Sequence, residues 1–86
     1  MYKLTLTDEA RRVYEKANTP LARKLAKCFR LIEANPRAGN NAKPLKGPLA
    51  GRWRYRAGDY RMVYFVDDPA RIVSVIAIAH RRNVYE

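Results

Sequence analysis

The carboxyl-terminal half of the chain contains three runs rich in aromatic and β-branched residues, and these runs constrain the fold more than any other feature. They are residues 52–56, 60–66 and 72–79. Segments 57–59 and 67–71 separate them and are rich in Gly, Asp and Pro. Such runs joined by short turns predict a three-stranded antiparallel meander. The last run is apolar on both faces apart from Ser74, which indicates a strand covered on two sides.

The amino-terminal part predicts one strand followed by two helices. Apolar and polar side chains alternate over residues 2–7, which is the period of a strand with one buried face. Thr7 is placed to cap a first helix, and Thr19, followed by Pro20, to cap a second and longer one that ends at Asn35. We expect these helices to pack against each other and on one face of the sheet.

Between the second helix and the meander, residues 35–51 hold three of the five prolines and three of the four glycines. We therefore expect a long loop without regular structure here, and such loops are often functional. The whole pattern predicts a single small α+β domain over residues 1–86, with the element order β-α-α-β-β-β and a mostly antiparallel sheet.

The net charge narrows the possible functions. Eighteen Lys and Arg against eight Asp and Glu give a formal charge of +10, which is typical of proteins that bind nucleic acid or an acidic partner. Residues 34–66 carry seven positive groups and one negative group, so the excess is densest in the loop and the first two strands of the meander.

Cysteine and hydropathy exclude several classes of protein. The single cysteine, Cys28, excludes an internal disulfide framework, and with the single histidine it cannot build a zinc site. Cys28 lies on an apolar helical stripe, so we expect it in the core. No apolar stretch has the length of a signal peptide or of a membrane-spanning helix, so we expect a cytoplasmic protein that does not contact membranes.

The first run of the meander places three arginines on one face and two aromatic residues on the other. The arginines are Arg52, Arg54 and Arg56, and the aromatic residues are Trp53 and Tyr55. Like charges at this spacing repel unless an anion neutralises them, and the guanidinium fork fits phosphate oxygens well. The alternative is a solvated sheet face. The adjacent loop favours a phosphate-binding surface that includes Lys43 and Lys46, although simple solvation also explains both lysines.

Four further residues are candidates for a functional site. They are Arg61, His80, Arg81 and Tyr85. Arg61 interrupts an apolar run, so it either has an edge position or a partner such as Asp59 or Asp67, or it directs its charge into a groove. A lone histidine at a strand end is more often a surface residue than a catalyst. Tyr85 either packs on the sheet or reaches a groove.

Four segments, in their order and spacing, resemble the toxins of the RelE/ParE superfamily of bacterial and archaeal toxin–antitoxin pairs. They are Pro-Leu-Lys-Gly at 44–47, the arginine and aromatic run at 52–56, Gly-Asp-Tyr-Arg-Met-Val-Tyr at 58–64, and His-Arg-Arg-Asn-Val-Tyr at 80–85. The resemblance spans nearly the whole chain and is stronger to the RelE branch. It implies a RelE-like fold and a ribosome-dependent endoribonuclease that cuts mRNA in the A site through attack of the 2′-OH, without a metal or cofactor.

The resemblance also implies roles for individual residues. Arg61 and Arg81 match arginines that stabilise the scissile phosphate, Tyr85 a tyrosine that positions RNA, and His80 a general acid of some relatives, while Arg52 and Arg54 fall where several relatives have lysines. Arg56, Lys43 and Lys46 are expected to bind RNA. Some relatives have a glutamate base where Lys43 stands, and arginine is a poor base because it stays protonated. The sequence therefore leaves the general base unassigned.

Two other functions stay open at this point. A ParE-like toxin on the same fold would bind and inhibit DNA gyrase, although Arg52, Arg54 and the terminal Val84-Tyr85 favour the RelE branch. A non-catalytic RNA-binding module would use the same arginines, but the chain lacks a recognisable aromatic stacking platform. The partners we expect are a RelB-like antitoxin, acidic and partly disordered, together with the ribosome and mRNA, and no small-molecule cofactor.

Overall fold

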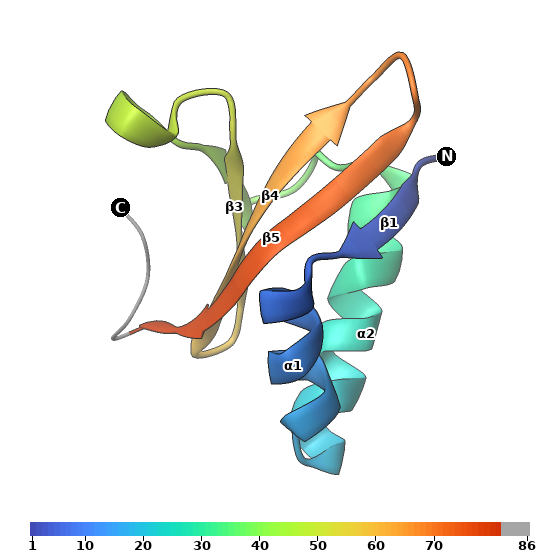
Figure 1. The fold of residues 1–86 in the computed structure, drawn as a ribbon, viewed down its shortest axis with the longest axis vertical. Helices are drawn as coiled ribbons and strands as arrows, with labels where there is room; N and C mark the ends of the chain where they lie inside the picture. Colours follow the sequence, from blue (N-terminus) through green and yellow to red (C-terminus); the bar gives the residue numbers. More distant parts are fainter. Residues whose placement is uncertain (82–86) are drawn as a thin grey trace.

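The computed structural model describes residues 1–81, which form five strands, two α-helices and one short 3₁₀-helix (Figure 1). In chain order the elements are β1 (Lys3–Leu6), α1 (Asp8–Lys16), α2 (Thr19–Ala34), β2 (Ala42–Pro44), the 3₁₀-helix η1 (Gly47–Leu49), β3 (Trp53–Ala57), β4 (Tyr60–Asp67) and β5 (Ile72–His80). The predicted meander is confirmed as β3, β4 and β5, and the first strand and both helices form where the sequence pattern places them.

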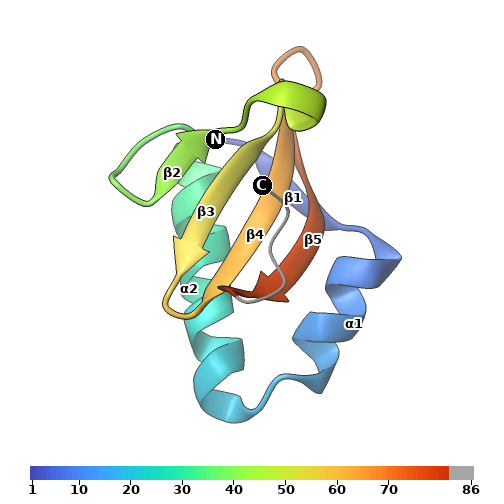
Figure 2. The same cartoon turned by 90° about the vertical axis from the view of Figure 1, so that its left-hand side faces the viewer.

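All five strands belong to one sheet in the order β1-β5-β4-β3-β2. Only β1 pairs in parallel, with the first half of β5, and every other neighbouring pair is antiparallel. Both helices lie on the same side of this sheet, as Figure 1 shows, and Figure 2 views the sheet from the opposite side. This arrangement confirms the α+β fold and leaves one sheet face without α-helices, which we call the helix-free face.

Two side chains cap the helices, and only one of them is the residue that we expected. Thr7 accepts a hydrogen bond from the backbone N–H of Ala10 and donates one to the carbonyl of Ile76, so it joins the start of α1 to β5. The prediction of Thr19 as the second cap is wrong. Asn18 caps α2, because its side-chain oxygen accepts from the N–H of Leu21, and this moves Thr19 into the first turn.

The prediction that residues 35–51 contain no regular structure is also wrong. Ala42–Pro44 forms β2 at the outer edge of the sheet, and Gly47–Leu49 forms η1. Pro44 lacks a backbone N–H, but an edge strand needs hydrogen bonds on one side only, so proline is tolerated there. The element order becomes β-α-α-β-β-β-β, and the added strand carries Lys43 into the sheet.

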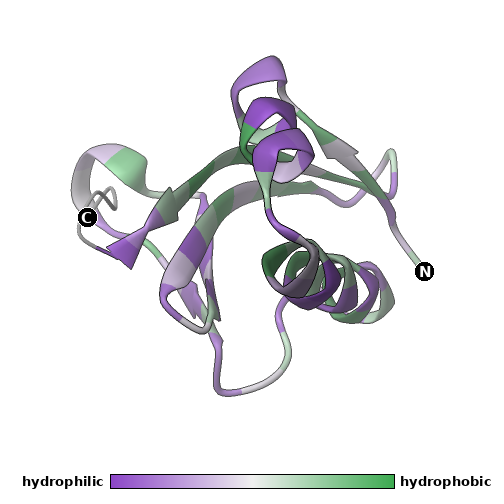
Figure 3. Cartoon of the chain, turned by 90° about the horizontal axis from the view of Figure 1, so that it is seen from below, coloured by the Kyte–Doolittle hydropathy of each residue, from purple (hydrophilic) through white to green (hydrophobic). Residues whose placement is uncertain are grey.

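The hydrophobic core lies between the two helices and the sheet. Figure 3 shows largely hydrophobic strands and hydrophilic residues on the outer sides of the helices. The fully buried large side chains come from α2 and the central strands: Leu25, Ile32, Met62, Tyr64, Val73 and Val75. Tyr14 and Phe29 pack edge to face at 5.3 Å between ring centroids and join α1 to α2. Cys28 is buried as expected, and burial raises the pKa of its thiol.

Tyr64 combines complete burial with one hydrogen bond, and this makes its hydroxyl a sensitive point of the fold. The hydroxyl donates to the carbonyl of Pro36 at 2.5 Å, and burial raises the pKa of Tyr64. We expect Tyr64→Phe to lower the free energy of unfolding by about 1–3 kcal/mol, because a buried carbonyl loses its partner. Thermal unfolding measures this loss, which corresponds to roughly 4–8 °C for each kcal/mol in a domain of this size.

The control for this substitution is Tyr14→Phe. Within residues 1–81, the hydroxyl of Tyr14 has no hydrogen-bond partner, although its ring packs on Phe29. Equal stability losses in the two variants would show that the Pro36 contact does not matter.

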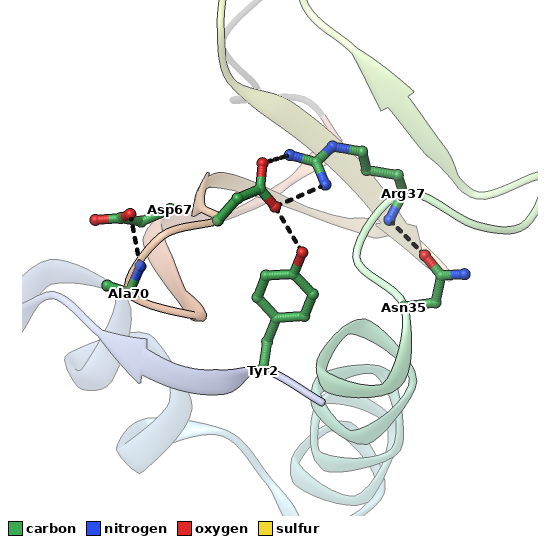
Figure 4. Close-up of polar contacts among 6 residues, drawn as sticks. Tyr2, Asn35, Arg37, Asp67 and Ala70 are labelled. Carbon is green, nitrogen blue, oxygen red and sulfur yellow. Dashed lines mark hydrogen bonds and ion pairs between the residues drawn. The ribbon is translucent and has the colours of Figure 1, made fainter.

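A polar cluster joins three distant segments at one end of the sheet (Figure 4). Asp68, in the turn between β4 and β5, accepts two hydrogen bonds from the Arg37 guanidinium, at 2.8 and 3.1 Å. The Tyr2 hydroxyl donates to the same carboxylate at 2.5 Å. The hydrogen bonds from Arg37, followed by the one from Tyr2, lower the pKa of Asp68.

The lowered pKa of Asp68 predicts a pH-dependent effect of Asp68→Asn. The carboxylate stabilises the fold above the pKa of an unfolded Asp, about 3.9, and this stabilisation is lost as the pH falls through the lower folded value. We therefore expect the variant to melt below the parent protein at neutral pH and the difference to close in acid. Melting curves at both pH values test this, and an unchanged difference in acid would contradict it.

Candidate functional site

The pairing register brings four cations together on the helix-free face. Lys43 of β2 lies opposite Arg54 of β3, and Arg56 of β3 lies opposite Arg61 of β4. Successive side chains of a strand point to opposite faces, so these four residues share the face opposite the buried Tyr55 and Met62. Two cross-strand pairs of like charge therefore lie next to each other.

A tight turn fixes the pairing of Arg56 with Arg61. Gly58 and Asp59 alone connect β3 to β4, and Gly58 has a φ of +63°, which glycine adopts without steric strain. A Cβ on Gly58 would also lie 2.7 Å from Nζ of Lys24. The turn therefore fixes the pairing register of β3 and β4. This register places Arg56 and Arg61 side by side.

Backbone hydrogen bonds on either side of β2 hold Lys43 in place. The N–H of Arg56 donates to the carbonyl of Asn41 at 3.0 Å, and the N–H of Leu45 donates to the carbonyl of Arg52 at 2.9 Å. These bonds extend the pairing of β2 with β3 beyond its three residues. Lys43 is exposed, but its backbone belongs to the sheet.

These side chains enclose a hollow of about 100 Å³, which we call the basic pocket. Its lining residues are Asn40, Asn41, Lys43, Arg54, Arg56 and Arg61. A water molecule takes about 30 Å³ in the liquid, so the pocket has room for one phosphate group or a few waters. Guanidinium, ammonium and amide groups are all hydrogen-bond donors, so the lining suits an anion with several acceptor oxygens.

Three cations of the basic pocket, Lys43, Arg56 and Arg61, have no acidic partner within residues 1–81. The ion pairs of this part of the chain join Asp8 to Arg11, Arg37 to Asp68 and Asp59 to Arg81. None of them involves Lys43, Arg56 or Arg61. Because like charges directly opposite each other destabilise a sheet, this arrangement weakens the fold unless an anion binds.

Arg61 has neither an edge position in the sheet nor an acidic partner within residues 1–81. Asp59 lies 4.0 Å from the Arg81 guanidinium, and the Asp67 carboxylate accepts from the N–H of Ala70. Arg61 is half-buried in the inner strand β4 and contributes to the basic pocket instead.

The other predicted arginine of the first run, Arg52, lies elsewhere. It precedes β3 and lines a second hollow of about 350 Å³, together with Glu9, Pro48, Leu49, Val63, Ile76 and Ala77. This second hollow is mostly apolar. Lys46 is exposed next to η1 and does not line the basic pocket.

The predicted residues at the end of β5 do not all join the basic pocket. His80 lies opposite Tyr60, and their rings pack edge to face at 5.4 Å, whereas Arg61 lies opposite Ala79. The alternation of side chains therefore separates His80 from Arg61 by the thickness of the sheet. Arg81 is exposed directly after β5, with its N–H bonded to the carbonyl of Asp59. Tyr85 lies outside the described residues.

Sequence reasoning did not single out Asn40 and Asn41, which complete the basic pocket. Their only signal is an Asn pair after a glycine, which is typical of a turn. Residues 1–81 hold no group of three or more His, Cys, Asp or Glu side chains placed to bind a metal ion. In the same part of the chain, neither α-helix is long and apolar enough to cross a bilayer.

Comparison with known proteins gives a family match over almost the whole chain. The family described as ParE toxin of type II toxin–antitoxin system, parDE, matches residues 4–85. The chain is 40% identical over 43 residues to toxin RelG of Mycobacterium tuberculosis, which covers 50% of this chain and 49% of that protein. The chain thus spans about half the length of the curated relatives it matches.

Solved structures of similar fold agree with this match. The toxin–antitoxin complex RelBE2 of Mycobacterium tuberculosis contains a chain with 28% identity and a TM-score of 0.81, over 93% of this chain and 98% of that one. The YoeB/ParE toxin of Agrobacterium tumefaciens has 29% identity and a TM-score of 0.81, over 91% of this chain and 96% of that one. With the fold, the family match and the shared architecture in agreement, this chain belongs to the RelE/ParE superfamily as a toxin of type II toxin–antitoxin systems.

Proposed function

We propose that this toxin is a ribosome-dependent endoribonuclease that cuts mRNA in the A site and so inhibits translation. The observation that carries the proposal is the basic pocket, in which Lys43, Arg54, Arg56 and Arg61 converge on a space of phosphate size. Because these residues repel one another across the sheet, an anionic ligand explains their arrangement better than stability does.

The proposed reaction is a transesterification within the RNA. The 2′-oxygen attacks the neighbouring 3′-phosphorus, the bond to the 5′-oxygen breaks, and the products are a 2′,3′-cyclic phosphate and a free 5′-OH. Negative charge builds up on the phosphate oxygens in the transition state. Preorganised donors at such a position typically contribute about 10²–10³-fold each to the rate. Arg54 and Arg61 are half-buried donors, and Arg56 shares their pocket.

We expect ribosome dependence because the lining of the basic pocket holds few groups that can act as a general acid or base. Its lining contains no carboxylate and no imidazole. An enzyme of this kind gains most of its rate from the alignment of the 2′-oxygen with the scissile bond, which the ribosome can impose on a codon. We therefore expect little cleavage of free RNA.

The other predicted site residues have different roles in the proposed reaction. Arg81 and Tyr85 remain proposed contacts to the RNA, and Arg52 and Lys46 extend the positive surface beyond the basic pocket. The placement of His80 on the opposite side of the sheet from Arg61 does not support it as the general acid. A free 5′-oxygen would then take its proton from water.

A cognate antitoxin is the proposed protein partner. The similar RelBE2 structure is a toxin–antitoxin complex. On this chain the net charge of +10 and the cationic lining of the basic pocket suit an acidic segment that folds on binding. Such a segment would compete with RNA for the same cations. Action on translating ribosomes would place the toxin in the cytoplasm.

The experiment that tests this function uses purified ribosomes, a defined mRNA and primer extension to map new 5′ ends. We expect cuts in phase with codons that require ribosomes and disappear with a 2′-deoxy nucleotide at the cut position. Cuts on free RNA at the same rate would contradict ribosome dependence. Intact mRNA under all conditions would contradict the nuclease function.

Inhibition of DNA gyrase is the second candidate function, because the description of the matching family names the ParE toxin. A gyrase inhibitor would stop supercoiling of plasmid DNA in a purified reaction and leave ribosome-bound mRNA intact. The two assays on one protein preparation decide between the candidates.

A further inference from the structure

The second hollow lies beside the basic pocket on the helix-free face, and its floor continues that pocket across the sheet. Arg54 of the basic pocket lies opposite Val63, which in turn lies opposite Ala77, and both apolar residues line the second hollow. Arg52 also lines it and precedes Arg54 by two residues, a spacing of about 7 Å along a strand. One ligand can therefore occupy both spaces at once.

The two spaces differ in size and in chemistry. The second hollow has a volume of about 350 Å³, against about 100 Å³ for the basic pocket, and most of its lining is apolar. Sites for small organic ligands are typically roughly 300–1,000 Å³ and mostly apolar, with a few polar groups that fix the orientation. An apolar space of this size next to a cationic pocket of phosphate size matches the two parts of a nucleotide, the base and the phosphate.

A bulge in β5 and the start of α1 together shape the wall of the second hollow. Ile76 is an extra residue in the pairing of β5 with β4, and it lines the hollow. Its carbonyl accepts a hydrogen bond from the Thr7 hydroxyl at 2.7 Å, and Thr7 also caps α1. Glu9 follows in the first turn of α1 and lines the hollow as well. The bulge thus fixes the backbone that carries an acidic side chain of the wall.

Glu9 and Arg52 are the charged residues in the lining of the second hollow. Within residues 1–81, neither of them belongs to an ion pair. A carboxylate has two acceptor oxygens, and a guanidinium group has a fork of donors. Guanine is the RNA base that matches both groups, because N1–H and the N2 amine are adjacent donors, while O6 and N7 are adjacent acceptors. The other three bases lack a pair of adjacent donors for the two oxygens of a carboxylate.

We propose that the second hollow binds a guanine base next to the scissile phosphate and that Glu9 selects this base. This inference rests on the proposed nuclease function. The Glu9 carboxylate accepts hydrogen bonds from N1–H and from the N2 amine, and Arg52 donates to O6 and N7. The apolar side chains of Leu49 and Ile76 pack on the base, while the basic pocket holds its phosphate. The toxin therefore cuts most readily where a guanine flanks the cut.

Glu9→Gln tests this role, because the glutamine amide has one donor and one acceptor in place of two acceptors. That combination fits the edge of adenine, where N1 accepts and the N6 amine donates. Two sets of four mRNAs vary the base on either side of the cut, and single-turnover cleavage is measured on ribosomes. At one of these positions the parent toxin should cut guanine about 10–100-fold faster than adenine, the usual discrimination of one bidentate pair. In the variant this ratio should fall by at least about tenfold.

The matched control is Glu15→Gln, which removes the same charge from an exposed position of α1 outside both spaces. It should keep the cleavage rate and the base preference of the parent toxin. Equal cleavage of all four bases by the parent toxin, or the parent preference in Glu9→Gln, would overturn the guanine site alone and leave the second hollow to a protein partner. Absence of cleavage of every mRNA by the parent toxin would overturn the nuclease function as well.

Discussion

Arg61→Ala is expected to slow mRNA cleavage on the ribosome by about 10²–10³-fold, the usual effect of removing one donor to a transition-state oxyanion. Arg61 is half-buried between β3 and β5 and lines the basic pocket, so its guanidinium is fixed by neighbouring strands before RNA binds. A preorganised cation needs no rearrangement during the reaction, and it stabilises the negative charge that develops on the phosphate oxygens in the transition state. Single-turnover cleavage with saturating toxin measures the change.

The fold should survive this substitution. Within residues 1–81, Arg61 has no ion pair, and its removal relieves the repulsion from Arg56 opposite. The control is Arg30→Ala, an exposed arginine on α2, on the other side of the sheet. It removes the same charge and should leave cleavage unchanged. Cleavage by Arg61→Ala at the parent rate would remove Arg61 from the reaction, and an equal loss of rate in both variants would point to a general charge effect.

The sequence predicts the framework of this fold because its signals are local. Turn sequences separate β3, β4 and β5, and capping residues mark the helix starts within a few residues. β2 has no such signal, because it is three residues long and exists through pairing with β3. Its short sequence, Ala42–Pro44, contains a proline and reads as loop until the partner strand is known.

Part of the basic pocket could be predicted as well, because it too depends on a local signal. Arg54, Arg56 and Arg61 share a face because strand alternation is a local rule, which the structure follows. His80 does not share the sheet face of Arg61, because β5 contains a bulge. Val75 pairs with Tyr64 and Ala77 with Val63, so Ile76 is an extra residue that shifts the alternation of everything after it. The sequence around Ile76 contains no signal that predicts this bulge.

The second large effect is a gain of stability together with a loss of activity in Arg56→Glu. Arg56 is exposed and lies directly opposite Arg61, so the substitution replaces a repulsive cross-strand pair with an attractive one. Such pairs contribute roughly 0.2–1 kcal/mol each, so we expect the free energy of unfolding to rise by about 1 kcal/mol. The melting temperature of a domain of this size then rises by roughly 4–8 °C.

Cleavage by Arg56→Glu should fall by at least about 10²-fold, because a carboxylate in the basic pocket neutralises Arg61 and repels the scissile phosphate. Arg30→Glu changes the net charge equally on the helical side of the molecule and should keep most of the activity. Melting curves and cleavage rates of the three proteins test both halves of the prediction. A variant that is more stable and inactive would show that the four cations are retained for an anion at the expense of the sheet. A less stable variant would contradict the repulsion between Arg56 and Arg61, and a variant as active as the parent protein would contradict a role of Arg56 in the reaction.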